Sequence, residues 1–149
     1  VYKRQPLFAF EMVALLSNQH PLLARSHLSA EDFADQTLIT YPVPDDMLDL
    51  IRQVLRPAGV SVPRRTTELT VAILQLVASG RGVAALPLWA VKHYLDRGYV
   101  SQRSITAQGL TSRLYAVWPA QATGRNHLED FVRIVRETTF VSLPDIELL

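Results

Sequence analysis

Cysteine is absent from this sequence of 149 residues. Its absence excludes disulfide bonds, thiolate nucleophiles and cysteine-based zinc sites, and it fits a reducing compartment such as the cytoplasm. Long apolar runs are also absent: no stretch approaches the roughly 20 consecutive apolar residues that a membrane-spanning helix requires. We therefore expect neither a disulfide-stabilised scaffold nor a membrane partner.

Charge of one sign is equally scarce. Lys and Arg number 15 against 14 for Asp and Glu, the net charge is +1, and the longest pure basic run is Arg64-Arg65. Nucleic-acid binding requires clustered cations that replace condensed counterions, so this chain is not expected to contact DNA itself. The composition, 48% hydrophobic and 19% charged, is typical of a folded globular domain or of two small lobes.

Residue patterns that carry catalysis are missing too. The four histidines do not stand at metal-ligand spacing from one another, and no serine lies in a Gly-x-Ser-x-Gly turn. Gly80-Arg81-Gly82 follows an expected helix and precedes a strand, the reverse of a dinucleotide-binding loop, and is interpreted as a helix stop. We therefore expect no enzyme, no cofactor and no metal.

Strand and helix patterns alternate along the chain. Apolar or β-branched runs predict strands at 11–16, 37–41, 65–68, 83–86 and 113–118. Capping residues, apolar periodicity and Gly or Pro stops predict helices at 29–34, from Asp45 to Pro57, through Ile73–Val77 to Gly80, from Pro87 to Gly98, and from Asn126 onward. The fold class is therefore α/β, with a parallel unit at about 36–100. The strands at 11–16 and 113–118 are expected to lie together in another lobe.

Two of these helices carry explicit expectations about their apolar faces. The face of the Asp45 helix is expected to hold Met47, Leu50, Ile51, Val54 and Leu55, and that of the Asn126 helix to hold Leu128, Phe131, Val132 and Val135.

Three loops at strand ends favour a binding crevice. In open α/β sheets, ligands lie outside the carboxyl ends of the strands, and here those ends are residues 41–43, 68–70 and 86–87. Thr70 begins an apolar helix, so the unpaired N–H groups of Val71 and Ala72 could hold a carboxylate. The alternative is that Thr70 is only a helix cap.

Three segments carry a family resemblance, in the same order and spacing. They are His20-Pro21-Leu22-Leu23, Leu38-Ile39-Thr40-Tyr41-Pro42, and the stretch from Leu76 to Pro87 that contains Ser79-Gly80-Arg81-Gly82. Together they resemble the effector-binding domain of LysR-type transcriptional regulators across nearly the whole chain. The resemblance implies two Rossmann-like lobes of the periplasmic-binding-protein type II architecture, with residues 1–37 and 103–149 in the first lobe and 38–102 in the second. It also implies that the first lobe is incomplete and that the chain is cut at its N-terminus.

Within that family, the segments at 57–61, 73–89 and 109–116 resemble in particular the regulators of methionine biosynthesis. This resemblance implies homocysteine as the effector, self-association as a dimer or tetramer, and promoter binding only through an N-terminal helix-turn-helix domain outside this chain. The effector-binding residues that it implies are Tyr41, Pro42, Val43, Glu68, Leu69, Thr70, Val71, Leu86 and Pro87. Thr70 and Val71 would hold the carboxylate, Glu68 the ammonium group, and Val43, Leu86 and Pro87 the thiol arm.

Two other classes share the two-lobe scaffold. One is a solute-binding protein of a transporter, and the other is an enzyme such as a prephenate dehydratase. That enzyme family uses a Thr-Arg-Phe motif, and Thr111-Ser112-Arg113-Leu114 is the nearest segment here and does not match it.

Overall fold

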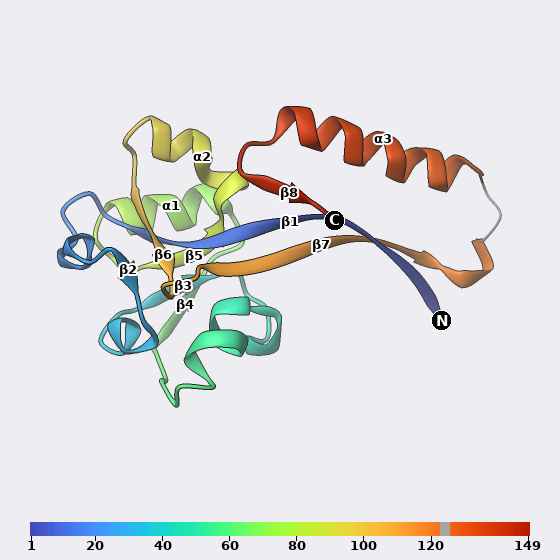
Figure 1. Cartoon of the computed structure of the whole chain (residues 1–149). Coiled ribbons are helices and arrows are strands. Elements are labelled where there is room, and N and C mark those ends of the chain that lie inside the picture. Colours follow the sequence, from blue (N-terminus) through green and yellow to red (C-terminus); the bar gives the residue numbers. More distant parts are fainter. Residues whose placement is uncertain (123–125) are drawn as a thin grey trace. The chain divides into compact units, whose positions relative to one another are not determined.

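Strands and helices alternate along most of the chain, as expected for an α/β protein (Figure 1). The computed structural model describes residues 1–122 and 126–149. Its elements are β1 (Tyr2–Leu16), η1 (Pro21–Ala24), β2 (His27–Leu28), η2 (Ala30–Phe33), β3 (Leu38–Thr40), η3 (Asp45–Met47), η4 (Ile51–Leu55), β4 (Arg64–Thr66), α1 (Thr70–Ala78), β5 (Ala84–Pro87), α2 (Leu88–Asp96), β6 (Ser101–Ile105), β7 (Leu110–Pro119), η5 (Ala120–Ala122), α3 (Asn126–Ser142) and β8 (Ile146–Leu148).

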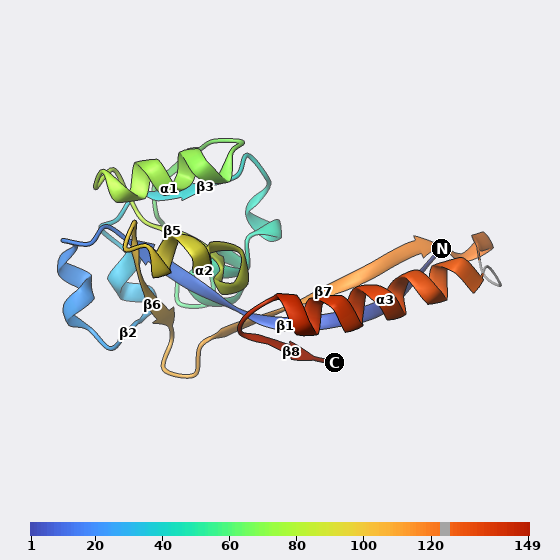
Figure 2. The ribbon, with the colours of Figure 1, turned by 90° about the horizontal axis from the view of Figure 1, so that it is seen from above.

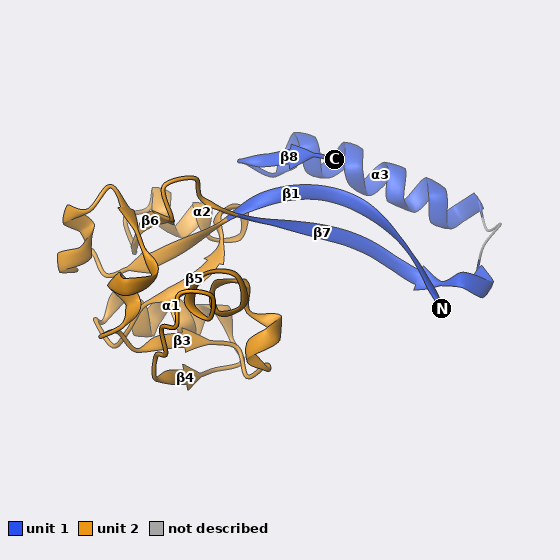
Figure 3. Ribbon diagram, turned by 60° about the horizontal axis from the view of Figure 1, so that its bottom comes forward, with its two compact units in different colours: residues 1–11, 111–149 blue, residues 12–110 orange. Residues whose placement is uncertain are grey.

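The chain divides into two compact units, coloured separately in Figure 3. Unit 1 consists of residues 1–11 and 111–149, and unit 2 of residues 12–110. The lobe boundaries inferred from the family resemblance, at 37, 38, 102 and 103, do not coincide with these units and stay a prediction.

Unit 2 is built around the second half of β1. Residues 12–16 pair antiparallel with β5 on one side and with β6 on the other, and Val13, Ala14, Leu15 and Leu16 are fully buried. A strand that is covered on both faces carries an uninterrupted apolar run, which explains the sequence here. The strand predicted at 113–118 lies in β7, which pairs with β1, and the expectation that 11–16 and 113–118 share another lobe stays a prediction.

The expected parallel pairing is present on the other side of unit 2. Strands β3 and β4 are parallel, and Leu38 forms a parallel bridge with Val83 just before β5. Helix α1 contacts β3, beside which it lies in Figure 2, and α2 contacts β5. Ile73, Leu74 and Val77 of α1 are buried as expected, whereas Leu76 is half-buried.

The glycines after α1 have different roles. Gly80 has φ +75°, a left-handed conformation that ends the helix as expected. Gly82 instead lies where a Cβ would be 2.5 Å from the carbonyl oxygen of Thr37. This close approach lets Val83 donate to the Thr37 carbonyl at 2.9 Å and accept from the Ile39 N–H at 2.8 Å.

Residues 45–55 do not form the expected single helix. Asp45–Met47 is a short 3₁₀ helix, Leu48 is extended, and Ile51–Leu55 is a π-helical turn closed by the Arg56 N–H and the Ile51 carbonyl at 2.9 Å. Asp45 was expected to cap a helix, but its carboxylate accepts a hydrogen bond from Arg64 instead. Met47 is consequently exposed, while Leu50, Ile51 and Leu55 are buried as expected.

The predicted helix at 29–34 is also shorter than expected and has 3₁₀ geometry. Ser29 is its N-cap residue, and the Ser29 N–H donates to the Asp32 carboxylate at 2.8 Å. Asp32 also pairs with Arg25 at 2.8 Å, which further ties this turn to the preceding loop.

Unit 1 contains residues 2–11 of β1, most of β7, α3 and β8. Strand β8, which the sequence did not predict, pairs antiparallel with β1 through Phe8 and Leu148. Val132 is the buried residue of α3, and Phe131, expected on the apolar face, is exposed. None of the helices in the described ranges is long and apolar enough to span a membrane.

Substituting Gly82→Ala should lower the free energy of unfolding by about 1–3 kcal/mol, because the added methyl group overlaps the Thr37 carbonyl and the Ile39 side chain. Urea denaturation measures this loss. Arg81→Ala, at an exposed neighbouring position, is the control and should change stability by less than about 0.5 kcal/mol. Equal effects of the two substitutions would contradict the proposed close approach.

Candidate functional site

The loops that follow β3 and β4 meet through two hydroxyl groups. The Tyr41 hydroxyl, just beyond β3, lies 2.5 Å from the Thr70 Oγ1 at the start of α1. The loop after β4 leads directly into α1, so this hydrogen bond joins the first two of the three strand ends predicted to converge.

A pocket of about 210 Å³ lies beside this contact within unit 2. Tyr41, Leu86 and Pro87, which are three of the nine predicted site residues, line it. The remaining lining residues are Met12, Leu38, Ile39, Thr40, Met47, Leu48, Asp49, Leu50 and Ala85. The pocket is therefore mainly apolar with a few polar groups, as is usual for small-molecule sites.

Sequence reasoning missed the contribution of β1 and of residues 47–50. Met12 reaches the pocket because it is the cross-strand partner of Pro87 in the β1–β5 pair. That pairing is a property of the sheet register, which no local pattern reveals. Met47 was instead expected on the apolar face of a helix beginning at Asp45, and Leu48 next to it. That helix does not form as a single element.

The start of α1 agrees in part with the expectation. Leu69 is the N-cap residue, with an extended backbone and no side-chain cap, so Thr70 is the first helical residue and not the cap. The Ala72 N–H was expected to be unpaired but donates to the Leu69 carbonyl at 3.0 Å. In the described parts of the chain, the N–H groups of Thr70 and Val71 have no hydrogen-bond acceptor.

Apolar side chains surround this helix start without being buried. Leu69 is 62% exposed and Val71 is 57% exposed. Neither residue, nor Thr70, lines the pocket. The helix start therefore lies next to Tyr41 at the edge of the pocket and not inside it.

The other predicted residues lie outside the pocket lining. Pro42 is exposed, Val43 is half-buried, and Glu68 is exposed without an ion pair to any residue of 1–122 or 126–149. The charged lining residue is Asp49, whose carboxylate accepts a hydrogen bond from Arg52 at 2.5 Å. Glu68 is thus available to a ligand cation, whereas Asp49 already has a cationic partner.

Two arginines pair with Asp45 and Asp46, which immediately precede the lining residue Met47. Arg64 contacts Asp45, and Arg56 contacts Asp46. The hydrogen bond from Arg56 to Asp46, together with the charge of Asp46, raises the pKa of Arg56 above its ordinary value. The two ion pairs therefore balance the carboxylates of residues 45 and 46.

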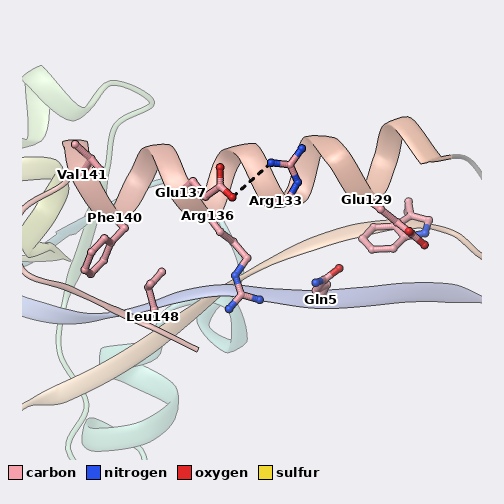
Figure 4. A pocket seen from close by; sticks show the side chains of 9 residues that line it. Gln5, Glu129, Arg133, Arg136, Glu137, Phe140, Val141 and Leu148 are labelled. Atoms are coloured by element: carbon pink, nitrogen blue, oxygen red, sulfur yellow. Dashed lines mark hydrogen bonds and ion pairs between the residues drawn. The ribbon is translucent and has the colours of Figure 1, made fainter.

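A second and larger cavity, of about 800 Å³, belongs to unit 1 (Figure 4). Its lining includes Gln5 of β1 and Arg136, which points from α3 toward β1 and donates to the carbonyl of Leu149. Arg133 hydrogen-bonds to Asp130 and pairs with Glu137, contacts that raise the pKa of Arg133. No predicted site residue lies there.

Metal-binding geometry is not found in the described ranges, where no three His, Cys, Asp or Glu side chains are grouped to hold an ion. His20, for example, is occupied structurally: Nδ1 accepts from the Leu22 N–H at 3.1 Å and Nε2 lies 3.0 Å from the Gln36 side-chain oxygen. These contacts account for the histidine without a metal.

The architecture and the position of the pocket at the strand ends are those of a ligand-binding regulatory domain. Residues 2–139 match the family described as the LysR substrate binding domain. The chain therefore belongs to that family, and its mixed α/β structure has the periplasmic-binding-protein type II-like fold of LysR effector domains.

Among the relatives, the HTH-type transcriptional regulator MetR of Haemophilus influenzae is 49% identical over 97% of this chain and 47% of its own length. MetR of Escherichia coli K12 is 36% identical over 95% of this chain and 44% of its own. The regulatory domain of MetR from N. meningitidis superposes with a TM-score of 0.94 at 52% identity, covering 99% of this chain and 71% of that one. The chain thus spans about half the length of these curated relatives. They are transcriptional regulators and not enzymes, which confirms the expectation that the chain is no enzyme.

A double-mutant cycle with Tyr41→Phe and Thr70→Val should give a coupling free energy of about 0.5–1.5 kcal/mol in urea denaturation, the usual net value of one partly buried hydrogen bond. Each single substitution removes one hydroxyl from the same contact, so the double variant should be only slightly less stable than either single variant. Strictly additive losses would mean that the two hydroxyls do not interact in solution.

Proposed function

We propose that this chain is the effector-binding domain of a LysR-type regulator of methionine biosynthesis, and that its effector is L-homocysteine. The observation that carries the proposal is the contact between Tyr41 and Thr70 beside an apolar pocket at the strand ends. The similarity to MetR regulators supports the choice of pathway.

The proposed binding mode follows the chemistry of the ligand. The carboxylate would accept hydrogen bonds from the unpaired N–H groups of Thr70 and Val71, where the helix dipole favours an anion. The Thr70 hydroxyl, which hydrogen-bonds to the Tyr41 hydroxyl at the same helix start, would donate a third hydrogen bond to the carboxylate. Glu68, exposed and unpaired within the described residues, would accept the ammonium group.

The thiol arm of the ligand would enter the pocket. Leu86 and Pro87 supply apolar surface there, and a volume of about 210 Å³ is large enough for a short thiol-bearing chain. Val43, Pro42 and Leu69 would flank the entrance. This arrangement would separate a polar end at α1 from an apolar end at β5, which orients an amino acid in one direction.

Regulation would require parts of the protein beyond these 149 residues. The chain spans about half the length of its relatives. For the whole protein we therefore also propose DNA binding by a helix-turn-helix domain, self-association and action in the cytoplasm. An effector can shift a conformational equilibrium only through its different affinities for the two states. In an oligomer, such a shift would alter the spacing of the DNA-binding domains.

Calorimetric titration tests the ligand and the helix start together. L-Homocysteine should bind, and Thr70→Ala should weaken binding about 5–10-fold, corresponding to roughly 1–1.4 kcal/mol for one lost hydrogen bond. Thr66→Ala, at an exposed position on β4, should leave the affinity unchanged. Methionine and cysteine serve as control ligands.

Two outcomes would contradict parts of this proposal. Heat from another amino acid or an organic acid but none from L-homocysteine would remove the ligand and retain the regulator. Equal affinities of the wild type and Thr70→Ala would instead show that the Thr70 hydroxyl takes no part in binding the carboxylate.

A further inference from the structure

Arg64, at the start of β4, makes an unusually dense set of contacts with one loop. Its Nη2 donates to the Thr40 Oγ1 at 2.8 Å, to the Val43 carbonyl at 2.9 Å and to the Tyr41 carbonyl at 3.3 Å. Its Nε lies 3.3 Å from the Thr40 Oγ1, and its Nη1 pairs with the Asp45 carboxylate. One guanidinium therefore contacts four residues of the segment 40–45, which leads from β3 to η3.

Two other side-chain contacts hold this loop, the hydrogen bond from Tyr41 to Thr70 and the ion pair of Asp46 with Arg56. The backbone hydrogen bonds within it are local: Val43 N–H to the Tyr41 carbonyl, Met47 N–H to the Pro44 carbonyl and Leu48 N–H to the Asp45 carbonyl, at 2.9–3.0 Å. Such turns define local shape but do not attach the loop to the sheet. Most of its side-chain hydrogen bonds to other elements come from Arg64, whose side chain is only 22% exposed.

The same loop forms one wall of the pocket. Tyr41 lies at its beginning, and Met47, Leu48 and Asp49 lie just beyond its end, and all four line the pocket. Arg64 itself is not a lining residue. Its contacts fix the segment from Thr40 to Asp45, which immediately precedes the lining residues 47–49.

We propose that Arg64 is a positioning residue that holds residues 41–48 in the conformation that forms the effector pocket. The proposal rests on the proposed function of that pocket and adds the residue that pre-organises it. Without Arg64 the loop would sample open conformations, and the apparent dissociation constant would rise in inverse proportion to the remaining fraction of the competent state.

Arginine is required for geometric reasons. A guanidinium offers five N–H donors in a planar fork, whereas a lysine ammonium is a compact charge on a flexible chain. Lysine at position 64 could still pair with Asp45 but could not reach Thr40 and the Tyr41 and Val43 carbonyls in the same geometry. The second cation near Asp45, Arg56, lies 3.9 Å away and is 54% exposed, so it cannot substitute for these contacts.

The neighbouring residue provides a matched control. Arg65 lies on the same short strand and is exposed, and within the described parts of the chain its side chain makes no hydrogen bond or ion pair. Successive strand residues point to opposite faces, so Arg65→Ala removes an equal charge without affecting the loop. Val100→Ala removes buried apolar volume at a position that does not line the pocket, and it controls for a general loss of stability.

The first measurement is amide hydrogen exchange at Met47 and Leu48, followed by NMR in the wild type and each variant. Arg64→Ala should accelerate exchange at these two amides by about 10–100-fold, and Arg64→Lys by a smaller factor because the pair with Asp45 persists. Arg65→Ala should leave both rates within about twofold. If Arg64→Ala does not fold, Arg64→Lys and Asp45→Asn provide the same comparison.

The second measurement is the dissociation constant of L-homocysteine in the same variants, which should rise as the inverse of the closed fraction of the loop, most in Arg64→Ala and not at all in Arg65→Ala. Unchanged exchange at Met47 and Leu48 in the Arg64 variants would overturn the proposal. So would a uniform acceleration over all of unit 2, as expected for Val100→Ala, or complete loss of protection at the two amides with unaltered affinity. A wild type that binds no L-homocysteine would refute the proposed ligand, while the exchange data would still decide the role of Arg64.

Discussion

The pairing of residues 12–16 with two strands at once is the interaction on which unit 2 depends. Val13 to Leu16 are completely buried, and their backbone groups bond to β5 on one side and to β6 on the other. A strand in this position needs partners on both edges, because unpaired backbone groups in an apolar core are costly. The same pairing places Met12 opposite Pro87. The register of β1 and β5 therefore also determines which side chains form the floor of the pocket.

Above that floor, polar contacts at the ends of the strands control the shape of the site. Tyr41 joins the end of β3 to the start of α1, and Arg64 joins β4 to the loop beyond β3. Apolar packing holds the strands but cannot specify the conformation of a loop that buries little surface. Directional hydrogen bonds can specify the conformation of such a loop, because each has a narrow range of acceptable geometry. The pocket therefore combines a packed base with a hydrogen-bonded wall.

The sequence predicted those parts of the fold in which the local pattern and the tertiary environment agree. The runs at 37–41 and 83–86 form strands, Thr70–Ala78 forms a helix that ends at Gly80, and β3 and β4 are parallel. The failures occur where distant residues decide. Asp45 has the local features of a helix cap, but Arg64, 19 positions later, recruits its carboxylate. Met12 reaches the pocket through a strand register, and Gly82 is required by the carbonyl of Thr37 and not by its own turn. For the site, Tyr41, Leu86 and Pro87 could be identified from their positions at strand ends, whereas Arg64 appeared only as part of an ordinary basic pair.

The π-helical turn at Ile51–Leu55 has a consequence for the evolution of this segment. A π turn holds one more residue than an α turn between the same hydrogen-bonded ends, and here it closes from Arg56 to Ile51. An insertion of one residue into an ancestral α-helix would produce this turn without displacing the elements before and after it. Homologous sequences that lack one residue between Asp49 and Pro57 are therefore expected to retain the flanking strands and to carry an ordinary α-helical turn in its place. Such a gap would mark a single ancient length change and not a loss of the fold.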